Sequence, residues 1–347
     1  LLITSLSSWL QQYNANNSTL NPIVIRFKVP DSGAKPFYDE IRGNVSFDLK
    51  EIDDFVILKS DGMPTYHLAH VVDDHEMKIS HIIRGEEWIS STPRHVLIHD
   101  ALDWNLPKYV HVPLILGKDK SKLSKRHGAE SALEYKEKGY LPEALLNFLA
   151  LLGWSPGDNK EIMNLSEIIE KFTIKRILGH PAVFDPEKLE WMNGSYIRNL
   201  NDEELSKYIL NEINKDIKSG GLLSDSVDSN ILISKISSIT PLIKERLKTF
   251  SESSYLVEYF FYDNFKIEKE KLLPKKVESF QIIEGLKKSI ELIIKIEEFE
   301  PENLEVQFRK LAEDLNLKAG QLFFPIRIAL TRRKESPPLF DTLKVIG

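Results

Sequence analysis

Cysteine is absent from the sequence, so the chain can form neither a disulfide bond nor a thiolate metal site. No apolar run approaches the roughly 20 residues that span a bilayer. Residues 1–10 are apolar and serine-rich but have no basic start, and we do not interpret them as a signal peptide. We therefore expect a cytoplasmic protein without a membrane partner.

An excess of positive charge is absent as well. The formal net charge is −6, so any contact with nucleic acid must come from a local basic surface and not from the whole molecule. The common glycine-rich phosphate loops, GxGxxG and GxxxxGK[ST], do not occur. What the chain does have is length, 347 residues with 42% hydrophobic content, which is enough for two or three domains with cores of their own.

The densest group of charges lies between Gly117 and Gly128. Five cations and one carboxylate fall between Lys118 and Arg126. The serines and spaced lysines of this loop suit an array of phosphate oxygens. A basic loop that is merely solvated is the alternative explanation.

Strand and helix patterns alternate before this loop. Apolar runs predict strands at 55–58, 79–84 and 110–116, with helices at 65–72 and 92–103 between them. Thr92 is the expected N-cap of the second helix and Pro93 its first residue. This alternation is typical of a doubly wound parallel sheet, whose ligands bind beyond the carboxyl ends of the strands. Because Arg84 and the basic loop both leave such ends, we expect them to face one site.

These motifs carry a family resemblance. Residues 122–126, Lys-Leu-Ser-Lys-Arg, resemble the signature lysine loop of class I aminoacyl-tRNA synthetases. An ordered set of further segments resembles bacterial-type glutamyl-tRNA synthetase: 61–67, 71–75, 84–93, 140–147, 184–189 and 191–198. The resemblance runs from about residue 24 to the end of the sequence.

The resemblance implies an α/β region followed by an all-α region. It assigns 1–60 to the C-terminal part of the acceptor-binding insertion, 61–101 to the second half of a Rossmann-type catalytic domain, 102–200 to a stem-contact domain with the lysine loop, and 201–347 to a helical anticodon-binding domain. No β-barrel pattern is present, which argues against the glutaminyl enzymes of the eukaryotic type. The family's His-x-Gly-His-type ATP motif does not occur, so we expect a fragment of a longer enzyme that lacks its N-terminal part.

For glutamate, the resemblance implies a binding set of Tyr66, His70, Arg84, Glu87 and Trp88. Arg84 would pair with a substrate carboxylate, because a planar guanidinium forms two-point pairs. An ion pair with Glu86 or Asp73 is the alternative for Arg84. Glu87 would accept the substrate ammonium, or it is a solvated acid at a helix start.

The rest of the glutamate set is aromatic or heteroaromatic. Tyr66 and Trp88 would form a flat wall, with ordinary core packing as the alternative. His70 stands where the family usually has Asn. His67, His75 and His81 do not have the spacing of a metal site, and we predict no protein-bound metal.

For ATP, the resemblance implies binding by Lys122, Leu123, Ser124, Lys125 and Arg126. Lys122 and Lys125 would have the catalytic role, which is to neutralise charge that develops on the phosphates. Mg²⁺ would arrive with ATP as a substrate complex. For the anticodon, the resemblance implies Arg246, Arg327 and Ser336, although each arginine could also be a solvated surface charge.

The expected function is therefore ATP-dependent activation of glutamate to glutamyl-adenylate, followed by transfer to the 3′ end of tRNA(Glu). Glutamine tRNA is a further candidate acceptor, and we expect a monomer. The alternative is a non-catalytic tRNA-binding protein derived from a synthetase.

Overall fold

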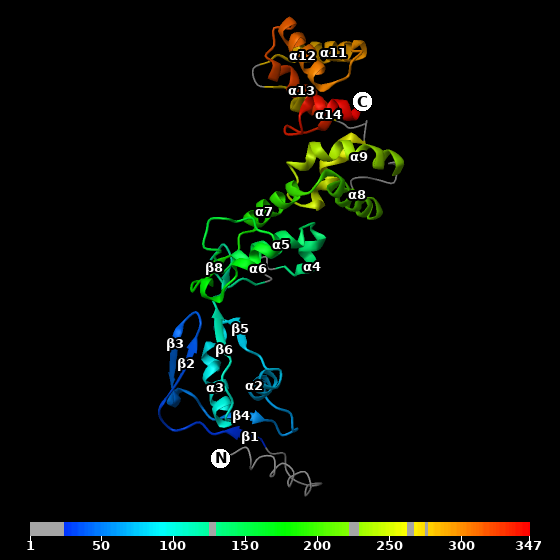
Figure 1. Cartoon of the computed structure of the whole chain (residues 1–347). Helices are drawn as coiled ribbons and strands as arrows, with labels where there is room; N and C mark the ends of the chain where they lie inside the picture. The colour runs from blue at the N-terminus through cyan, green and yellow to red at the C-terminus, as the bar shows by residue number, and fades with distance from the viewer. Residues whose placement is uncertain (1–23, 125–129, 222–228, 262–266, 275–276) are drawn as a thin grey trace. The chain divides into compact units, whose positions relative to one another are not determined.

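The computed structural model describes residues 24–124, 130–221, 229–261, 267–274 and 277–347, and it divides into two compact units (Figure 1). The first unit comprises residues 1–129 and 146–185, and the second comprises residues 130–145 and 186–347. The residues of α5 (Pro142–Leu151) are shared between them.

The first unit is of the α/β type. Its strands are β1 (Ile25–Phe27), β2 (Ala34–Asp39), β3 (Gly43–Asp48), β4 (Phe55–Leu58), β5 (His81–Gly85), β6 (Lys108–Val112), β7 (Ile115–Leu116) and β8 (Ala182–Val183). Its other helices are η1 (Leu49–Glu51), α2 (Tyr66–Glu76), η2 (Glu86–Ser91), α3 (Thr92–Ala101), α6 (Leu165–Lys171) and η4 (Ile174–Arg176).

The main sheet has the strand order β3-β2-β6-β5. Strands β5 and β6 are parallel, as predicted, and their pairing runs from His81 with Lys108 to Gly85 with Val112. Strand β2 lies on the other side of β6, where Asp39 pairs with Tyr109. The hairpin of β2 and β3, seen beside β6 in Figure 1, therefore brings the end of β2 to the first half of β6.

Two strand predictions were wrong in part. Strand β4 does not join the parallel sheet but pairs antiparallel with β1, where Phe27 stacks on Phe55 at 5.2 Å between ring centroids. An apolar run shows that a strand is covered, not which sheet it joins. The predicted strand at 110–116 is two strands, because Pro113 follows β6 and has no N–H for a ladder; β7 then pairs with β8.

The predicted N-cap at Thr92 was also wrong. Helix η2 leads directly into α3, so Ser91 occupies the cap position without a side-chain cap bond. Thr92 lies inside the helix, fully buried, and its hydroxyl donates to the carbonyl of Trp88 at 3.0 Å. The side chain that suited a cap is instead used within the site described below.

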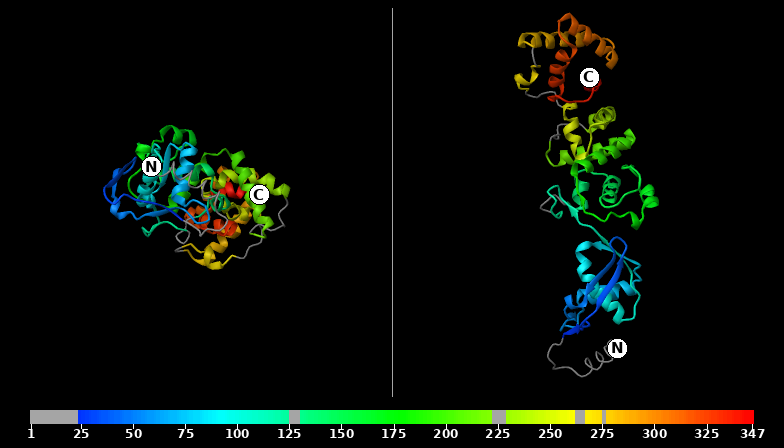
Figure 2. Two further views of the ribbon diagram at one scale, coloured as in Figure 1. Left: turned by 90° about the horizontal axis from the view of Figure 1, so that it is seen from below. Right: turned by 90° about the vertical axis from the view of Figure 1, so that its left-hand side faces the viewer.

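Every secondary-structure element in the described part of the second unit is a helix (Figures 1 and 2). Its helices are α4 (Ala132–Glu137), α7 (Pro186–Asn199), α8 (Asp202–Lys218), α9 (Ser229–Lys244), η5 (Phe250–Glu252), α10 (Ser253–Val257), η6 (Glu258–Phe260), η7 (Lys269–Leu272), α11 (Ser279–Lys295), α12 (Pro301–Asp314), α13 (Ala319–Thr331) and α14 (Leu339–Ile346). The α/β region followed by a helical region is thus confirmed.

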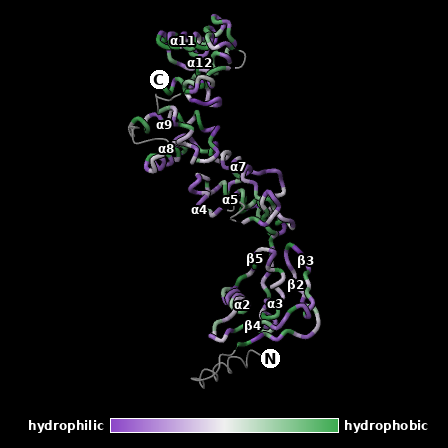
Figure 3. The backbone as a smooth tube through the Cα atoms, turned by 180° about the vertical axis from the view of Figure 1, so that it is seen from behind, coloured by the Kyte–Doolittle hydropathy of each residue, from purple (hydrophilic) through white to green (hydrophobic). Residues whose placement is uncertain are grey.

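Amphipathic helices build two cores in this unit. Leu205, Ile209 and Ile213 on α8 recur every four residues and are fully buried in one cluster. Leu304 and Phe308 on α12 belong to the other. The backbone tube in Figure 3 accordingly alternates between hydrophobic and hydrophilic colours along α11 and α12.

Candidate functional site

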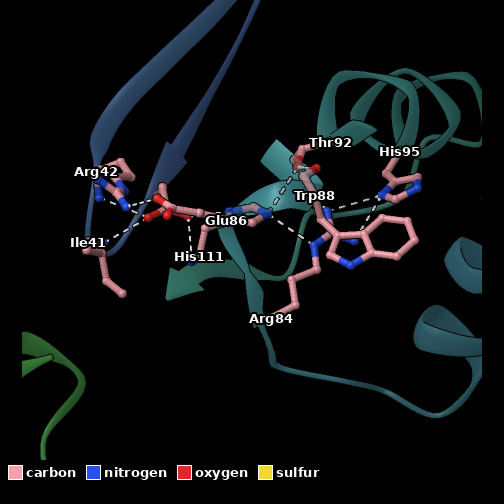
Figure 4. A network of polar contacts seen from close by, with 9 residues as sticks. Ile41, Arg42, Arg84, Glu86, Trp88, Thr92, His95 and His111 are labelled. Carbon is pink, nitrogen blue, oxygen red and sulfur yellow. Dashed lines mark hydrogen bonds and ion pairs between the residues drawn. The ribbon is translucent and has the colours of Figure 1, made fainter. Parts of the chain in front are cut away.

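A half-buried guanidinium, that of Arg84, lies at the carboxyl end of β5. The Nε of Arg84 donates to Nε2 of His111 at 3.0 Å, and its Nη2 donates to the hydroxyl of Thr92 at 2.9 Å (Figure 4). Longer contacts of 3.3 and 3.4 Å join its outer nitrogens to the rings of His70 and His95.

These partners of Arg84 are hydroxyl and imidazole acceptors, which carry no charge unless a ring takes up a proton. Among the described residues, no carboxylate forms an ion pair with Arg84, so the predicted alternatives with Glu86 and Asp73 were wrong. Glu86 pairs instead with Arg42 and accepts the N–H of Leu114 at 3.2 Å. Burial leaves the charge of Arg84 incompletely solvated and so lowers its pKa below the usual value. A carboxylate from a ligand would relieve that cost.

Three imidazole rings near Arg84 are held largely uncharged. Burial, together with the positive charge of Arg84, lowers the pKa of His95 to about 2. Burial also lowers the pKa of His67 and of His70, although Asp74 opposes the shift of His70 from 3.3 Å. His67 and His95 share a hydrogen bond of 3.0 Å. Arg84 is therefore a positive charge that lies next to the uncharged rings of His70 and His95.

Aromatic rings border the open side of the guanidinium. Tyr66 stacks on His70 with ring centroids 5.4 Å apart, and it lies 5.1 Å from Trp88. The guanidinium carbon of Arg84 is 5.8 Å from the Trp88 ring, which covers it in Figure 4. Tyr66 is 50% exposed and Trp88 36% exposed, so ordinary core packing does not account for either ring. The structure thus brings together four of the five residues of the predicted glutamate set.

The fifth residue, Glu87, points to the basic loop instead. Its Oε1 lies 3.0 Å from Nζ of Lys122. A backbone hydrogen bond and the contact with Lys122 lower the pKa of Glu87. The loop beyond β7 and the end of β5 therefore meet, as the positions of the strand ends predicted.

The loop itself is a tight turn. The N–H of Gly117 donates to Ser121 at 2.9 Å, and Lys120 has the left-handed φ of 63°. The carboxylate of Asp119 accepts the N–H and the hydroxyl of Ser121. Lys122 and Leu123 then return antiparallel to β7, as the hydrogen bond from Leu123 N to Ile115 O at 2.9 Å shows. Ser124 ends the described part of the loop, and Lys125 and Arg126 lie outside the described residues.

The three predicted anticodon residues meet in the second unit. The Nη1 of Arg327 donates to Ser336 Oγ, to Ser336 O at 3.1 Å and to Pro337 O at 2.8 Å. The Nη2 of Arg246 donates to the same Ser336 carbonyl at 2.7 Å. Burial lowers the pKa of Arg327, so the alternative of a solvated surface charge was wrong for this residue. Ser336 is itself buried, and both of its oxygens are occupied.

Within the described residues, no three His, Asp or Glu side chains are placed to hold a metal ion together. His75 stacks on Trp104 with ring centroids 3.8 Å apart, and the ring of His81 contacts Ser80. The same part of the chain has no helix that is both long and apolar enough to cross a membrane.

Sequence reasoning missed three buried polar residues of the site. Asp39, His95 and His111 are each 0% exposed. One signal was present for His111, a lone polar residue in the apolar run Tyr109-Val110-His111-Val112 of β6. Asp39 had no such signal, because its contact with His111 joins residues 72 positions apart.

Comparisons with known proteins agree with this geometry. A family model described as "tRNA synthetases class I (E and Q), catalytic domain" matches residues 4–191. A second model, "Anticodon binding domain", matches residues 203–347. The chain belongs to the class I tRNA synthetases of the E and Q family, and the predicted resemblance is confirmed.

Within this family, the chain is similar to individual glutamate–tRNA ligases. The chain is 44% identical over 326 residues to the glutamate–tRNA ligase of Dehalococcoides mccartyi, covering 93% of this chain and 66% of that protein. It is 42% identical to the ligase of Moorella thermoacetica, covering 93% of this chain and 65% of that protein. The chain thus spans slightly less than two thirds of these relatives. A crystal structure of a glutamate tRNA ligase from Elizabethkingia meningosepticum, in complex with its amino acid, matches with a TM-score of 0.80 and 32% identity over 99% of this chain and 68% of that one.

Proposed function

We propose that the protein is a glutamate–tRNA ligase, which activates glutamate with ATP and transfers it to the 3′ end of tRNA(Glu). The observation that carries this proposal is the guanidinium of Arg84. It is half-buried, its described partners are hydroxyl and imidazole groups, and it opens toward Tyr66 and Trp88. A guanidinium in such surroundings suits a carboxylate, and glutamate differs from glutamine in having one at its side-chain end.

In this reaction the α-carboxylate of glutamate attacks the α-phosphate of ATP in line, and pyrophosphate leaves. The protein positions the reactants and stabilises charge. Arg84 would hold the side-chain carboxylate, Tyr66, His70 and Trp88 would enclose the side chain, and Glu87 would accept the ammonium. Lys122 and Lys125 would neutralise the phosphates, with Leu123, Ser124 and Arg126 completing the ATP-binding loop. Magnesium would enter as the ATP complex.

The remaining assignments are proposed with this function. Residues 1–60 would belong to the acceptor-binding insertion, 61–101 to the catalytic domain, 102–200 to the stem-contact domain and 201–347 to the anticodon-binding domain. Arg246, Arg327 and Ser336 would take part in anticodon binding. The protein would act as a cytoplasmic monomer, with tRNA(Gln) as a second candidate acceptor.

The test is glutamate charging onto unmodified tRNA(Glu) and tRNA(Gln) by the protein at its natural length, with tRNA binding measured in the same samples. We expect charging of tRNA(Glu), and its loss in Arg84→Gln with tRNA binding intact. Binding of both tRNA and glutamate without charging would favour a non-catalytic binding protein. Charging with glutamine in place of glutamate would contradict the role of Arg84.

A further inference from the structure

A buried carboxylate–imidazole pair, Asp39 and His111, lies on the Nε side of Arg84. Figure 4 shows His111 beside Arg84. Asp39 ends β2 and His111 lies in β6, and both are 0% exposed. The Oδ2 of Asp39 accepts the main-chain N–H of His111 at 3.0 Å and meets its ring Nδ1 at 2.6 Å. The other oxygen, Oδ1, accepts the N–H groups of Ile41 at 3.0 Å and Arg42 at 2.9 Å.

Asp39 is ionised in this setting. Burial alone would raise the pKa of Asp39, but hydrogen bonds from the His111 ring and from three main-chain N–H groups outweigh burial and lower it below the usual value. An ionised carboxylate has no hydrogen to donate. The hydrogen between Asp39 and His111 therefore belongs to Nδ1 of the ring.

The tautomer of His111 determines how Arg84 is held. Because Nε of Arg84 always carries a hydrogen, the facing Nε2 of His111, at 3.0 Å, must be the acceptor. The hydroxyl of Thr92 gives its hydrogen to Trp88 O and so accepts from Nη2 of Arg84. These two bonds fix one edge of the guanidinium. On the other edge, the contacts with His70 and His95 are 3.3 to 3.4 Å long and weak.

We propose that Asp39 is a positioning residue for glutamate recognition, which acts through His111 to turn the Nη1 and Nη2 edge of Arg84, and not its Nε edge, toward the substrate carboxylate. This proposal rests on the proposed function. The substrate carboxylate would replace the long contacts with the two rings, His70 and His95, by short charge-assisted bonds. Asp39 itself never touches the substrate, so it supplies orientation without competing for Arg84.

The amide of asparagine cannot take the place of this carboxylate. Each oxygen of Asp39 faces at least one main-chain N–H, which can only donate. In Asp39→Asn, the new NH₂ group would face either Ile41 and Arg42 or the N–H of His111. Nδ1 of His111 would then no longer face an ionised acceptor, so the Nδ1–H tautomer would lose its stabilisation. In the other tautomer, the hydrogen on Nε2 would repel the Nε–H of Arg84.

The closing experiment compares Asp39→Asn with Asp48→Asn, a matched change at an exposed position in the same hairpin. Ring ¹⁵N chemical shifts report the His111 tautomer, calorimetry gives the affinities for L-glutamate and L-glutamine, and thermal unfolding reports folding. In the wild type we expect the Nδ1–H tautomer and a preference for glutamate. In Asp39→Asn we expect loss of that tautomer and a preference reduced about tenfold, which corresponds to the loss of one charge-assisted bond. Asp48→Asn should change neither.

A second variant separates positioning from folding. In His111→Asn the amide NH₂ can still donate to Asp39, but no acceptor remains in the place of the ring Nε2 for the Nε–H of Arg84, so selectivity should fall while the hairpin stays intact. Unchanged selectivity in a folded Asp39→Asn or His111→Asn would overturn the proposal. So would a hydrogen on Nε2 in the wild type, or unfolding of both variants. A wild type without any glutamate preference would instead count against the proposed function, while the tautomer result would still test the link from Asp39 to Arg84.

Discussion

The Nζ of Lys122 lies 3.0 Å from the Oε1 of Glu87, although the two residues are 35 positions apart in the chain. Their side chains are 61% and 45% exposed. Ion pairs between side chains as exposed to solvent as these contribute about 0 to 1 kcal/mol to stability. The contact therefore does little for the fold, and it places a loop cation and a candidate ammonium acceptor at one site.

We expect Lys122→Ala to change the free energy of unfolding by less than about 0.5 kcal/mol, as surface substitutions usually do. Under the proposed function it should lower ATP–pyrophosphate exchange by about 100-fold, the usual effect of removing one charge-stabilising group. Lys118→Ala is the matched control, because Lys118 is in the same loop and also faces an acid, Asp185, at 3.8 Å. Equal losses of exchange in both variants, or an equal loss of tRNA binding in Lys122→Ala, would contradict the phosphate role.

Local patterns explain which parts of the site could be predicted from the sequence. Arg84 lies near the end of β5, and Lys122 lies in the loop that follows β7. Charged residues at or soon after the end of an apolar run are visible in a short window of sequence. Asp39 could not be predicted in this way, because its role depends on β2 pairing with β6. The error over β4 has the same origin, since pairing between distant strands is not encoded in the apolar run itself.

Buried uncharged histidines predict a stability that depends on pH. His95 would take up a proton when unfolded, at an ordinary pKa near 6.5, but burial and Arg84 hold its folded pKa at about 2. Between these values the unfolded chain binds more protons, so stability is complete above pH 6.5 and falls as the pH falls. The slope contributed by one such group is at most about 1.4 kcal/mol per pH unit.

Urea unfolding of His95→Gln between pH 7.5 and 5.5 tests this effect. The amide of Gln can reach the place of the ring Nε2 that contacts His67 but does not titrate. We expect a shallower fall of stability with acid, by about 1 kcal/mol per pH unit, and residual dependence from His67, His70 and His99, whose pKa values are also lowered. The exposed His180 provides the control, and an unchanged slope in His95→Gln would contradict the buried, uncharged state of this ring.

The close approach of Gly139 to the 250–251 backbone predicts a large effect in the second unit. Gly139 has a φ of +79°, and a Cβ there would lie 2.6 Å from Phe250 N and 2.7 Å from Ser251 N. Its carbonyl also accepts the N–H of Phe250 at 3.0 Å. We expect Gly139→Ala to destabilise by about 3 kcal/mol, from the left-handed backbone and the forced separation.

The control for Gly139→Ala is Gly220→Ala, where φ is +70° but no atom lies within 4 Å of the added carbon. That variant should cost only about 1 kcal/mol, from backbone strain alone. Thermal unfolding of both variants measures the difference. Similar losses in the two would show that the contact with residues 250–251 is not tight.

The two arginines that hold the turn at Ser336 differ in how much they can offer to RNA. Arg327 gives Nη1 to three oxygens of Ser336 and Pro337, whereas the exposed Arg246 gives only Nη2 to Ser336 O. RNA bases are read by hydrogen bonds from free donors and by stacking. We therefore expect Arg327→Ala to lower stability by about 1 to 3 kcal/mol, because buried carbonyls lose their donor.

We expect Arg246→Ala to weaken tRNA binding at least tenfold, a typical loss for one base contact, with little loss of stability. Unfolding curves and tRNA binding, measured at one fixed salt concentration, separate the two effects. The control is Arg309→Ala, because Arg309 forms an exposed ion pair with Glu305. A stable Arg327→Ala variant with unchanged tRNA affinity would contradict both the structural and the recognition role of this residue.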